Sequence, residues 1–204
     1  MPLEGEIDQL ISALGPKTAT FLQLIKETAT RLGEAWNLKW IDLDFERGCV
    51  RVAPDKNSKP RQRKVLTRLL AMLMNLPASG EYVFRNGDID SIHSLDDFRR
   101  HFRDNGRRAA ARLQNPRILR TSFKTLRHFK ATTEYHKKDI LHVMQMLGHK
   151  NIQNTLIYTH LVNFEGDEFV CRVARTVDEA KDLVESGFDY VTDVDEMKLF
   201  HKTK

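Results

Sequence analysis

The stretch from Phe123 to His160 constrains this chain more than any other part of the sequence. It begins with a cationic cluster around Arg127 and continues to a Leu-Gly-His turn ending at His149. Tyr158 follows nine residues after that histidine. A helix through the cationic cluster would place Lys124 and Arg127, three residues apart, on one face. The remaining residues are expected to form a scaffold that brings further cations to this stretch.

The size of the chain predicts one domain or slightly more. It has 204 residues, of which 41% are hydrophobic, enough for a core and too many for a disordered tail. The longest apolar run is too short to cross a membrane, and no signal peptide opens the sequence. Cys49 and Cys171 lie far apart without CxxC spacing. This predicts two reduced thiols in a cytoplasmic protein.

Charge is distributed unevenly along the chain. Residues 99–130 contain eleven Lys or Arg and one acid, whereas residues 163–204 contain eleven acids and six bases. A dense basic region is often only a solvated helix face. Here it is interleaved with Phe98, Phe102, Phe123 and Phe129, which favours a nucleic-acid surface. The acidic segment is expected to lie off the nucleic acid. It is either a solvated face, or it packs on a neighbouring subunit or covers the basic cleft when DNA is absent.

The periodicity of apolar residues predicts a mostly helical domain with one small sheet. Between residues 40 and 66, Ile41, Leu43 and Phe45 alternate with acids, which predicts a half-buried strand. The pattern then predicts a returning strand through Val50 and Val52 and a third strand over residues 62–66. Together the three strands would form an antiparallel sheet with a basic hairpin tip. Helices are expected over 4–14, 17–32, 67–76, from Ser94 to about 113, from 121 or 122 to about 135, 138–147 and 151–159.

Two further features complete this prediction. Gly33 interrupts the helical pattern, so Arg31 is expected at a junction between helices, where its side chain can enter a cleft. Beyond residue 162 the pattern changes to a strand over 169–174, a helix opened by Thr176, and another strand over 188–200. This predicts a short βαβ-like appendage. The fold class is therefore α+β, mostly α, with a domain over 1–162 and an acidic appendage over 163–204.

Together these residue types suit a metal-free reaction at a phosphodiester. Arginine binds two phosphate oxygens through a planar fork, and one well-placed donor is worth about 10²–10³ in rate. A free tyrosine, with a pKa of about 10, needs cationic neighbours or a base before it can attack phosphorus. The stretch has no carboxylate cluster and no Cys/His set with metal-ligand spacing. A metal-dependent nuclease is therefore disfavoured, and no cofactor or metal is expected.

Five motifs in this order resemble one family. They are RLGEAWNLKW at 31–40, the basic hairpin around Lys56, TLRH at 125–128, LGH at 147–149, and Tyr158. Together they are similar to the catalytic domain of tyrosine recombinases, or phage-type integrases, over residues 4–162. The resemblance implies that Arg31 and Arg127 clamp the phosphate and that His149 hydrogen-bonds it. It also implies that Tyr158 forms a 3′-phosphotyrosyl link and that Lys56, with Lys59 as competitor, is the general acid.

The sequence departs from the family pattern in two places. The family usually has His-x-x-Arg, whereas this chain has Lys124-Thr-Leu-Arg127. Lysine can donate to a phosphate oxygen but is a poorer base than imidazole. The lysine at this position and the surrounding sequence HFKATTEYHKKDILHVMQMLGHKNIQNTLIYTHL resemble the archaeal branch of integrases. The amino-terminal domain usual in the family is also missing, which suggests either an excised catalytic fragment or a minimal recombinase.

The resemblance implies a recombinase that cleaves and rejoins double-stranded DNA at specific sites as a tetramer, without ATP or metal. Two alternatives remain open from the sequence: a type IB topoisomerase, which relaxes DNA as a monomer, and a DNA-binding relic that no longer turns over. Catalytic roles are expected for Arg31, Lys56, Lys124, Arg127, His149 and Tyr158. DNA contacts are expected for Lys59, Arg61, Arg63, Arg99, Arg103, Arg107, His128 and Lys150. The protein is expected to be cytoplasmic and DNA-associated, with no membrane partner.

Overall fold

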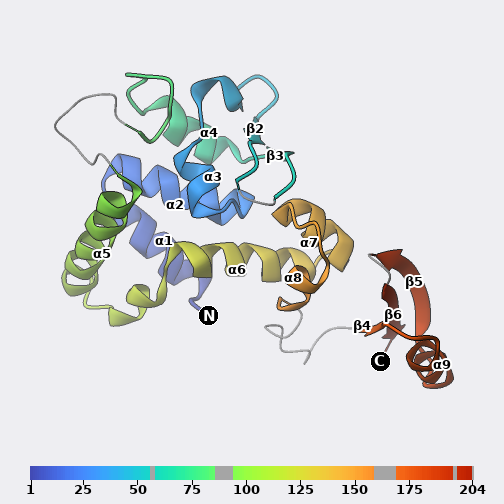
Figure 1. The fold of residues 1–204 in the computed structure, drawn as a ribbon. Helices are drawn as coiled ribbons and strands as arrows, with labels where there is room; N and C mark the ends of the chain where they lie inside the picture. Colours follow the sequence, from blue (N-terminus) through green and yellow to red (C-terminus); the bar gives the residue numbers. More distant parts are fainter. Residues whose placement is uncertain (56–57, 86–93, 159–168, 195–196, 204) are drawn as a thin grey trace.

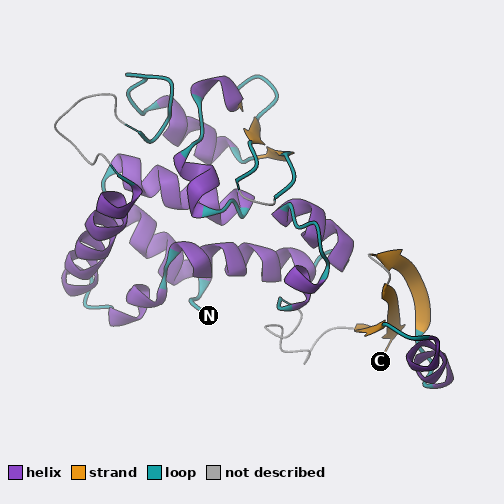
Figure 2. Ribbon diagram, viewed as in Figure 1, coloured by secondary structure: helices purple, strands orange, loops and turns teal. Residues whose placement is uncertain are grey.

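The structure, a computed structural model, describes the chain except for residues 56–57, 86–93, 159–168, 195–196 and 204. A bundle of helices forms most of the molecule, with a small sheet on one side and a second sheet at the carboxyl end (Figures 1 and 2). This confirms the predicted mostly helical α+β fold. The predicted domain boundary at residue 162 lies outside the described residues.

The helical part is built around two long helices in contact, α2 (Pro16–Thr28) and α6 (Phe123–Tyr135). Around them lie α1 (Glu4–Ala13), α3 (Leu32–Trp36), α4 (Thr67–Met74), α5 (Leu95–Arg112), α7 (Ile140–Leu147), α8 (Gln153–Leu156), and the 3-10 turns Trp40–Asp42 and Pro116–Arg120. Phe21, fully buried on α2, makes edge contacts with Phe84 and Phe123. This aromatic cluster fixes α6, and with it the residues of the predicted site, against the amino-terminal helices.

The first sheet is antiparallel in the order β1 (Leu43–Asp44), β2 (Cys49–Val52), β3 (Arg61–Lys64), as predicted. Its first strand is shorter than predicted. Residues 40–42 form a 3-10 turn in which the Asp42 N–H donates to the Lys39 carbonyl at 3.0 Å. The Trp40 N–H is paired with Glu81, which ties this segment to another part of the chain. Ile41 consequently faces solvent, with 82% of its surface exposed, and the predicted alternation begins only at Leu43.

Local sequence signals set the ends of the helices that carry the site. Ser122 caps α6, because its hydroxyl accepts the Thr125 N–H at 3.1 Å. Gly148 ends α7 in the left-handed conformation, at φ 68°. A Cβ at this position would lie 2.8 Å from Nη1 of Arg61, so only glycine fits there without displacement. The predicted helix over 151–159 is only α8, and Tyr158 lies two residues beyond its end.

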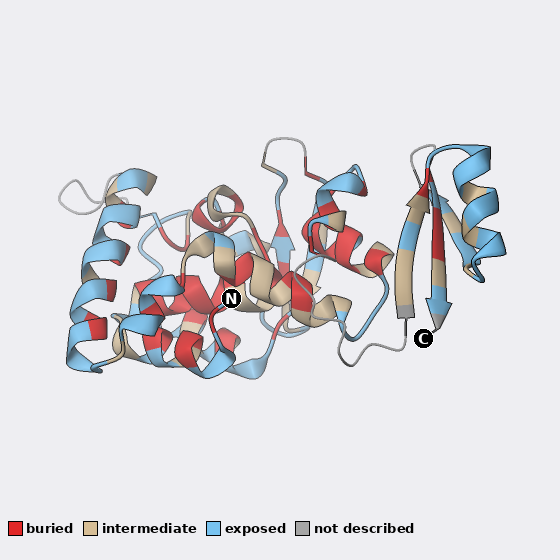
Figure 3. Cartoon of the chain, turned by 90° about the horizontal axis from the view of Figure 1, so that it is seen from below, coloured by how far each residue is buried: buried red, intermediate tan, exposed pale blue. Residues whose placement is uncertain are grey.

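The carboxyl-terminal segment forms β4 (Phe169–Ala174), α9 (Val177–Glu185), β5 (Asp189–Val194) and β6 (Met197–Thr203). The predicted single strand over 188–200 is two strands, and β6 lies between β4 and β5, antiparallel to both. The predicted βαβ unit is therefore split by an inserted strand. Met197 and Leu199 of β6 pack against Ile140 and Met144 of α7, whereas no residue of α9 is buried and most are exposed (Figure 3). None of the described helices is both long and apolar enough to span a membrane.

Candidate active site

One pocket of about 650 Å³ brings together most of the predicted catalytic residues. Its walls come from the junction between α2 and α3, from α6, and from the turns that follow α7 and α8. The predicted site residues that line it are Arg31, Lys124, Arg127, His128, His149 and Tyr158. Lys56, the predicted general acid, lies outside the described residues.

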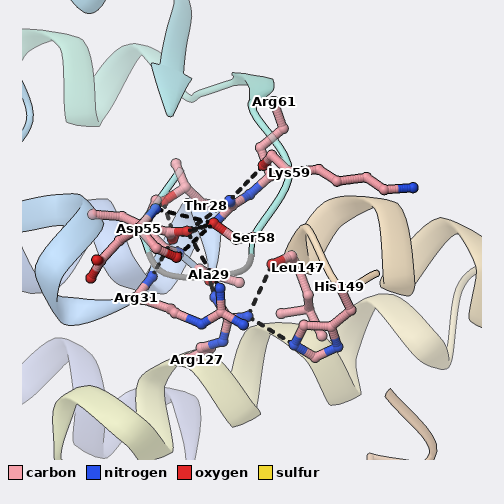
Figure 4. A network of polar contacts seen from close by, with 12 residues as sticks. Thr28, Ala29, Arg31, Asp55, Ser58, Lys59, Arg61, Arg127, Leu147 and His149 are labelled. Atoms are coloured by element: carbon pink, nitrogen blue, oxygen red, sulfur yellow. Dashed lines mark hydrogen bonds and ion pairs between the residues drawn. The ribbon is translucent and has the colours of Figure 1, made fainter. Parts of the chain in front are cut away.

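Arg127 forms the floor of the pocket, and only 8% of its surface is exposed. Its Nη1 donates to the carbonyl of Ala29, and its Nη2 donates to the carbonyl of Leu147 at 3.0 Å (Figure 4). Ala29 ends α2 in the left-handed conformation, at φ 53°. Burial lowers the pKa of Arg127, yet arginine remains charged in proteins. Arg127 therefore supplies a fixed positive charge that also joins α6 to α2 and α7.

Arg31 lies at the helix junction, as predicted, and precedes the first residue of α3. About a third of its side chain is exposed, and its Nη1 lies 3.7 Å from the Glu34 carboxylate. That nitrogen is buried, and no hydrogen bond engages it among the described residues. Arg31 also lines the pocket, and a guanidinium group with an unsatisfied nitrogen can donate to an anion. Of the two arginines, Arg31 is therefore the one less constrained by contacts within the protein.

His149 lies beneath the pocket, with 7% of its surface exposed. Its Nε2 is 3.1 Å from Nη2 of Arg127, and its Nδ1 is 2.9 Å from the Thr155 hydroxyl. Burial, followed by the charges of Arg127, Arg31 and Arg61, lowers the pKa of His149 to about 4. The imidazole is therefore neutral at pH 7 in the free protein.

Tyr158 is packed inside the pocket of its own chain, with 3% of its surface exposed. It shares an apolar cluster with Ala131 and Leu147. The ring of His128 meets it edge-on, with ring centroids 4.9 Å apart. Burial lowers the pKa of His128, and the charges of Lys124 and Arg127 lower it further. A neutral imidazole therefore lies against the phenol ring, while Lys124 is exposed at the pocket.

Glu34, at the start of α3, is a buried anchor of the site. Its side chain has no exposed surface and pairs with both terminal nitrogens of Arg61, at 2.6 and 3.0 Å. It also accepts the Ser58 hydroxyl and the Arg31 N–H, each at 2.7 Å. Arg61, 6% exposed, therefore holds β3 to α3. The predicted DNA contact at Arg61 stays a prediction, and it would require this ion pair to open.

We expect Glu34→Gln to destabilise the protein at neutral pH by about 3–5 kcal/mol, because it leaves the buried Arg61 charge unpaired. Burial alone would raise the pKa of Glu34, but Arg61, Arg31 and Ser58 together lower it. The carboxylate therefore stabilises the fold above the pKa of the unfolded chain, about 4.3. That contribution is lost as the pH falls through the lower folded value.

Urea unfolding at several pH values tests this expectation. The difference between wild type and Glu34→Gln should be largest near pH 7 and should shrink below about pH 4. Glu81→Gln is the matched control, because Glu81 pairs with Lys39 at the surface and its loss should change stability little. A Glu34→Gln protein as stable as the control at pH 7 would contradict the anchoring role.

Of the other predicted DNA contacts, His128 lines the pocket and the remaining residues lie around it. Lys59 and Lys150 are exposed, whereas Arg63 is half-buried beside Glu134. Exposed arginines of α5 line a second depression, of about 450 Å³, which shares Ser122 and Phe123 with the pocket. They are Arg99, Arg103 and Arg107. Across the described residues, no group of three or more His, Cys, Asp or Glu side chains is placed to hold a metal ion.

Comparison with known proteins identifies the family. The sequence profile of the phage integrase family matches residues 3–164, which include every residue of the pocket. The chain belongs to this family. A tyrosine recombinase, XerA, from Saccharolobus solfataricus is 27% identical over 168 residues, which cover 78% of this chain and 51% of the relative. A tyrosine recombinase from Thermosipho africanus is also 27% identical, over 79% of this chain and 57% of the relative.

This integrase-family chain spans only a little more than half the length of these two curated relatives. Solved structures support the fold. The crystal structure of XerA recombinase matches with a TM-score of 0.63 at 22% identity, over 92% of this chain and 64% of that one. The catalytic domain of bacteriophage HP1 integrase matches with a TM-score of 0.57 at 20% identity, over 80% of this chain and 88% of that domain.

Proposed function

We propose that this chain carries the catalytic site of a site-specific DNA recombinase, which cleaves and rejoins strands through a covalent 3′-phosphotyrosyl intermediate. One observation carries the proposal: Arg31, Lys124, Arg127 and His149 converge on the pocket that holds Tyr158. A tyrosine surrounded by phosphate-binding cations is suited to attack a phosphodiester. Membership in the phage integrase family supports the same reaction.

In the proposed reaction, the Tyr158 oxygen attacks the scissile phosphorus and releases its proton to solvent water. The new bond joins this oxygen to phosphorus, while the bond from phosphorus to the 5′ oxygen breaks. Arg31 and Arg127 stabilise the negative charge on the non-bridging oxygens. Lys56 is assigned as the general acid, which donates a proton to the departing 5′ oxygen. A second 5′-hydroxyl then attacks the phosphotyrosine, so the bond energy is conserved and neither ATP nor a metal ion is required.

The proposed roles differ in how firmly the geometry constrains each residue. Arg127 is fixed by its contacts, whereas Arg31 has an unsatisfied nitrogen that a phosphate oxygen would engage. Lys124, where the family usually has histidine, is assigned as a donor to a phosphate oxygen, since an ammonium group has no lone pair to accept a proton. The neutral ring of His128 braces Tyr158.

The proposed partner is double-stranded DNA with specific recombination sites, bound by a tetramer in a cytoplasmic, DNA-associated complex. Among the structural relatives, a Tn1549 transposon integrase was solved in complex with transposon right end DNA, and a lambda integrase as a dimer bound to a core site. Those statements concern the relatives. For this chain they support a search for complexes on DNA that contain more than one copy.

We expect Arg99, Arg103 and Arg107 of α5 to bind DNA phosphates, because these three side chains are exposed and line the depression beside the pocket. Replacing Arg99, Arg103 and Arg107 together with glutamine should lower the slope of log K against log salt by up to about 2.7, at about 0.9 for each lost phosphate contact. Fluorescence anisotropy on a labelled duplex at several salt concentrations measures this slope. Arg47→Gln, in the turn between β1 and β2, is the control, and an unchanged slope in the triple variant would remove these three arginines from the DNA surface.

Covalent capture tests the function itself. The protein is incubated with a duplex that carries a nick close to the cleavage position, so that the short released strand diffuses away and religation is prevented. A DNA–protein adduct that survives denaturation supports the proposal. Absence of an adduct on every duplex tried, including duplexes with the DNA sequences that flank the coding sequence of this chain, would contradict the proposal.

A further inference from the structure

The hydroxyl of Thr155 lies directly beneath His149 and is one of the most buried polar groups near the pocket. Thr155 is 1% exposed and lies on α8, which leads to Tyr158. Its Oγ1 is 2.9 Å from Nδ1 of His149. No motif of the sequence pointed to this residue. A buried hydroxyl in such a contact fixes the imidazole more firmly than an exposed one, because water cannot replace it.

The tautomer of His149 follows from its two partners. The Arg127 guanidinium has only N–H groups and can only donate a hydrogen bond. Nε2 of His149, 3.1 Å from Nη2 of Arg127, must therefore accept and carries no proton. In the neutral ring the proton then lies on Nδ1, which donates it to Oγ1 of Thr155. The two contacts define one tautomer and one ring orientation.

Thr155 also holds the segment that carries the nucleophile. The Tyr158 N–H donates to the carbonyl of Thr155 at 2.9 Å. One residue therefore binds His149 through its side chain and Tyr158 through its main chain. Arg127 binds the opposite nitrogen of the same imidazole and the carbonyl of Leu147. The tyrosine, the histidine and the buried arginine are linked through a continuous series of hydrogen bonds.

We propose that Thr155 is a positioning residue. It holds His149 as the Nδ1–H tautomer with Nε2 turned toward Arg127, and it fixes the position of the imidazole relative to Tyr158. The role rests on the function proposed above. It has a direct consequence for the reaction. With Nδ1 already protonated and bound to Thr155, any proton that His149 gains beside a DNA phosphate must enter at Nε2. The new N–H then points to the side of the ring where Arg127 lies.

Two substitutions at this position separate the hydroxyl from the shape of the side chain. Thr155→Val keeps the branched shape and removes the hydroxyl, and we expect it to slow adduct formation by about 10²-fold, a loss typical of misplaced catalytic groups. Thr155→Ser keeps the hydroxyl and should restore most of the rate. Thr132→Val is the matched control, because Thr132 is equally buried and its Oγ1 makes no hydrogen bond among the described residues. DNA affinity should be unchanged in all three.

A spectroscopic readout tests the tautomer without DNA. Long-range ¹H–¹⁵N spectra of the histidine-labelled chain at pH 7 should show His149 protonated at Nδ1, with its signals assigned by their loss in His149→Gln. In Thr155→Val the ring loses its partner at Nδ1 and can turn away from Arg127, so the Nδ1–H population should fall, whereas in Thr132→Val it should not change. An Nε2–H tautomer in the wild type, or a wild-type cleavage rate in Thr155→Val, would overturn the proposal.

The two proposals can fail separately. If the wild type forms no adduct with DNA, the proposed function is wrong, while the tautomer measured in the free chain still decides whether Thr155 positions His149. If the wild type forms an adduct but Thr155→Val cleaves equally fast, only the positioning role is wrong. Should Thr155→Val fail to fold, the wild-type spectrum and the rate of Thr155→Ser still decide the outcome.

Discussion

Tyr158→Phe is expected to abolish covalent capture of DNA while leaving the fold and the DNA affinity unchanged. Phenylalanine retains the ring, which fills the cluster with Ala131 and Leu147 and meets His128 edge-on. Only the hydroxyl is lost, so the buried packing of the ring is retained. Loss of a nucleophile can lower kcat by about 10⁶, which places the product below detection on a gel.

The measurement is the yield of denaturation-resistant adduct on the nicked duplex, with DNA affinity measured in parallel by anisotropy. Tyr135→Phe is the control, because Tyr135 ends α6 outside the pocket and should not affect capture. An adduct that persists in Tyr158→Phe would identify a different nucleophile. Lost affinity in Tyr158→Phe would instead show that the substitution damages the DNA surface, and the adduct assay would then be repeated at saturating protein.

Features that depend on neighbouring residues could be predicted from the sequence. Ser122 as the cap of α6 and Gly148 as the end of α7 follow from side-chain chemistry within four residues. The order of motifs likewise placed Arg31, Arg127, His149 and Tyr158 in one site, and the pocket contains all four. The prediction of Arg31 at a helix junction is confirmed as well.

Features that depend on distant residues could not be predicted. The pairing of Glu34 with Arg61 joins positions 27 residues apart, and nothing near Arg61 distinguishes it from the exposed Lys59 on the same hairpin. Ile41 follows an alternating pattern, but the N–H of the adjacent Trp40 donates a hydrogen bond to the Glu81 carbonyl, and Ile41 lies in a turn. Thr155 has no local signal, because its role depends on an imidazole delivered by a different turn.

Arg127→Lys is expected to reduce both cleavage and stability. The guanidinium satisfies two carbonyls and one imidazole nitrogen from a single plane, and a lysine ammonium cannot span all three. Each buried carbonyl left unpaired costs about 1–3 kcal/mol. Loss of a fixed donor at the phosphate lowers the rate by about 10²–10³. Urea unfolding and the adduct rate measure the two effects.

Arg31→Lys is the matched comparison at the second arginine. Its Nη1 makes no hydrogen bond among the described residues, so its replacement should slow cleavage to a similar degree at a smaller cost in stability. Equal destabilisation by both substitutions would show that Arg31 also holds the scaffold together. A normal cleavage rate in Arg127→Lys would remove the buried arginine from the phosphate-binding role.

Mixing the Tyr158→Phe and Arg127→Lys chains then shows whose tyrosine is used. Tyr158 lies in the pocket of its own chain, beside the Arg127 of that chain. If this arrangement persists on DNA, every site in a mixture of Tyr158→Phe and Arg127→Lys lacks one essential group, and no rapid adduct forms. Cleavage in trans would combine an intact arginine pocket with an intact tyrosine from the neighbouring copy. Restored adduct in the mixture would therefore show that α8 leaves its own pocket when the protein assembles on DNA.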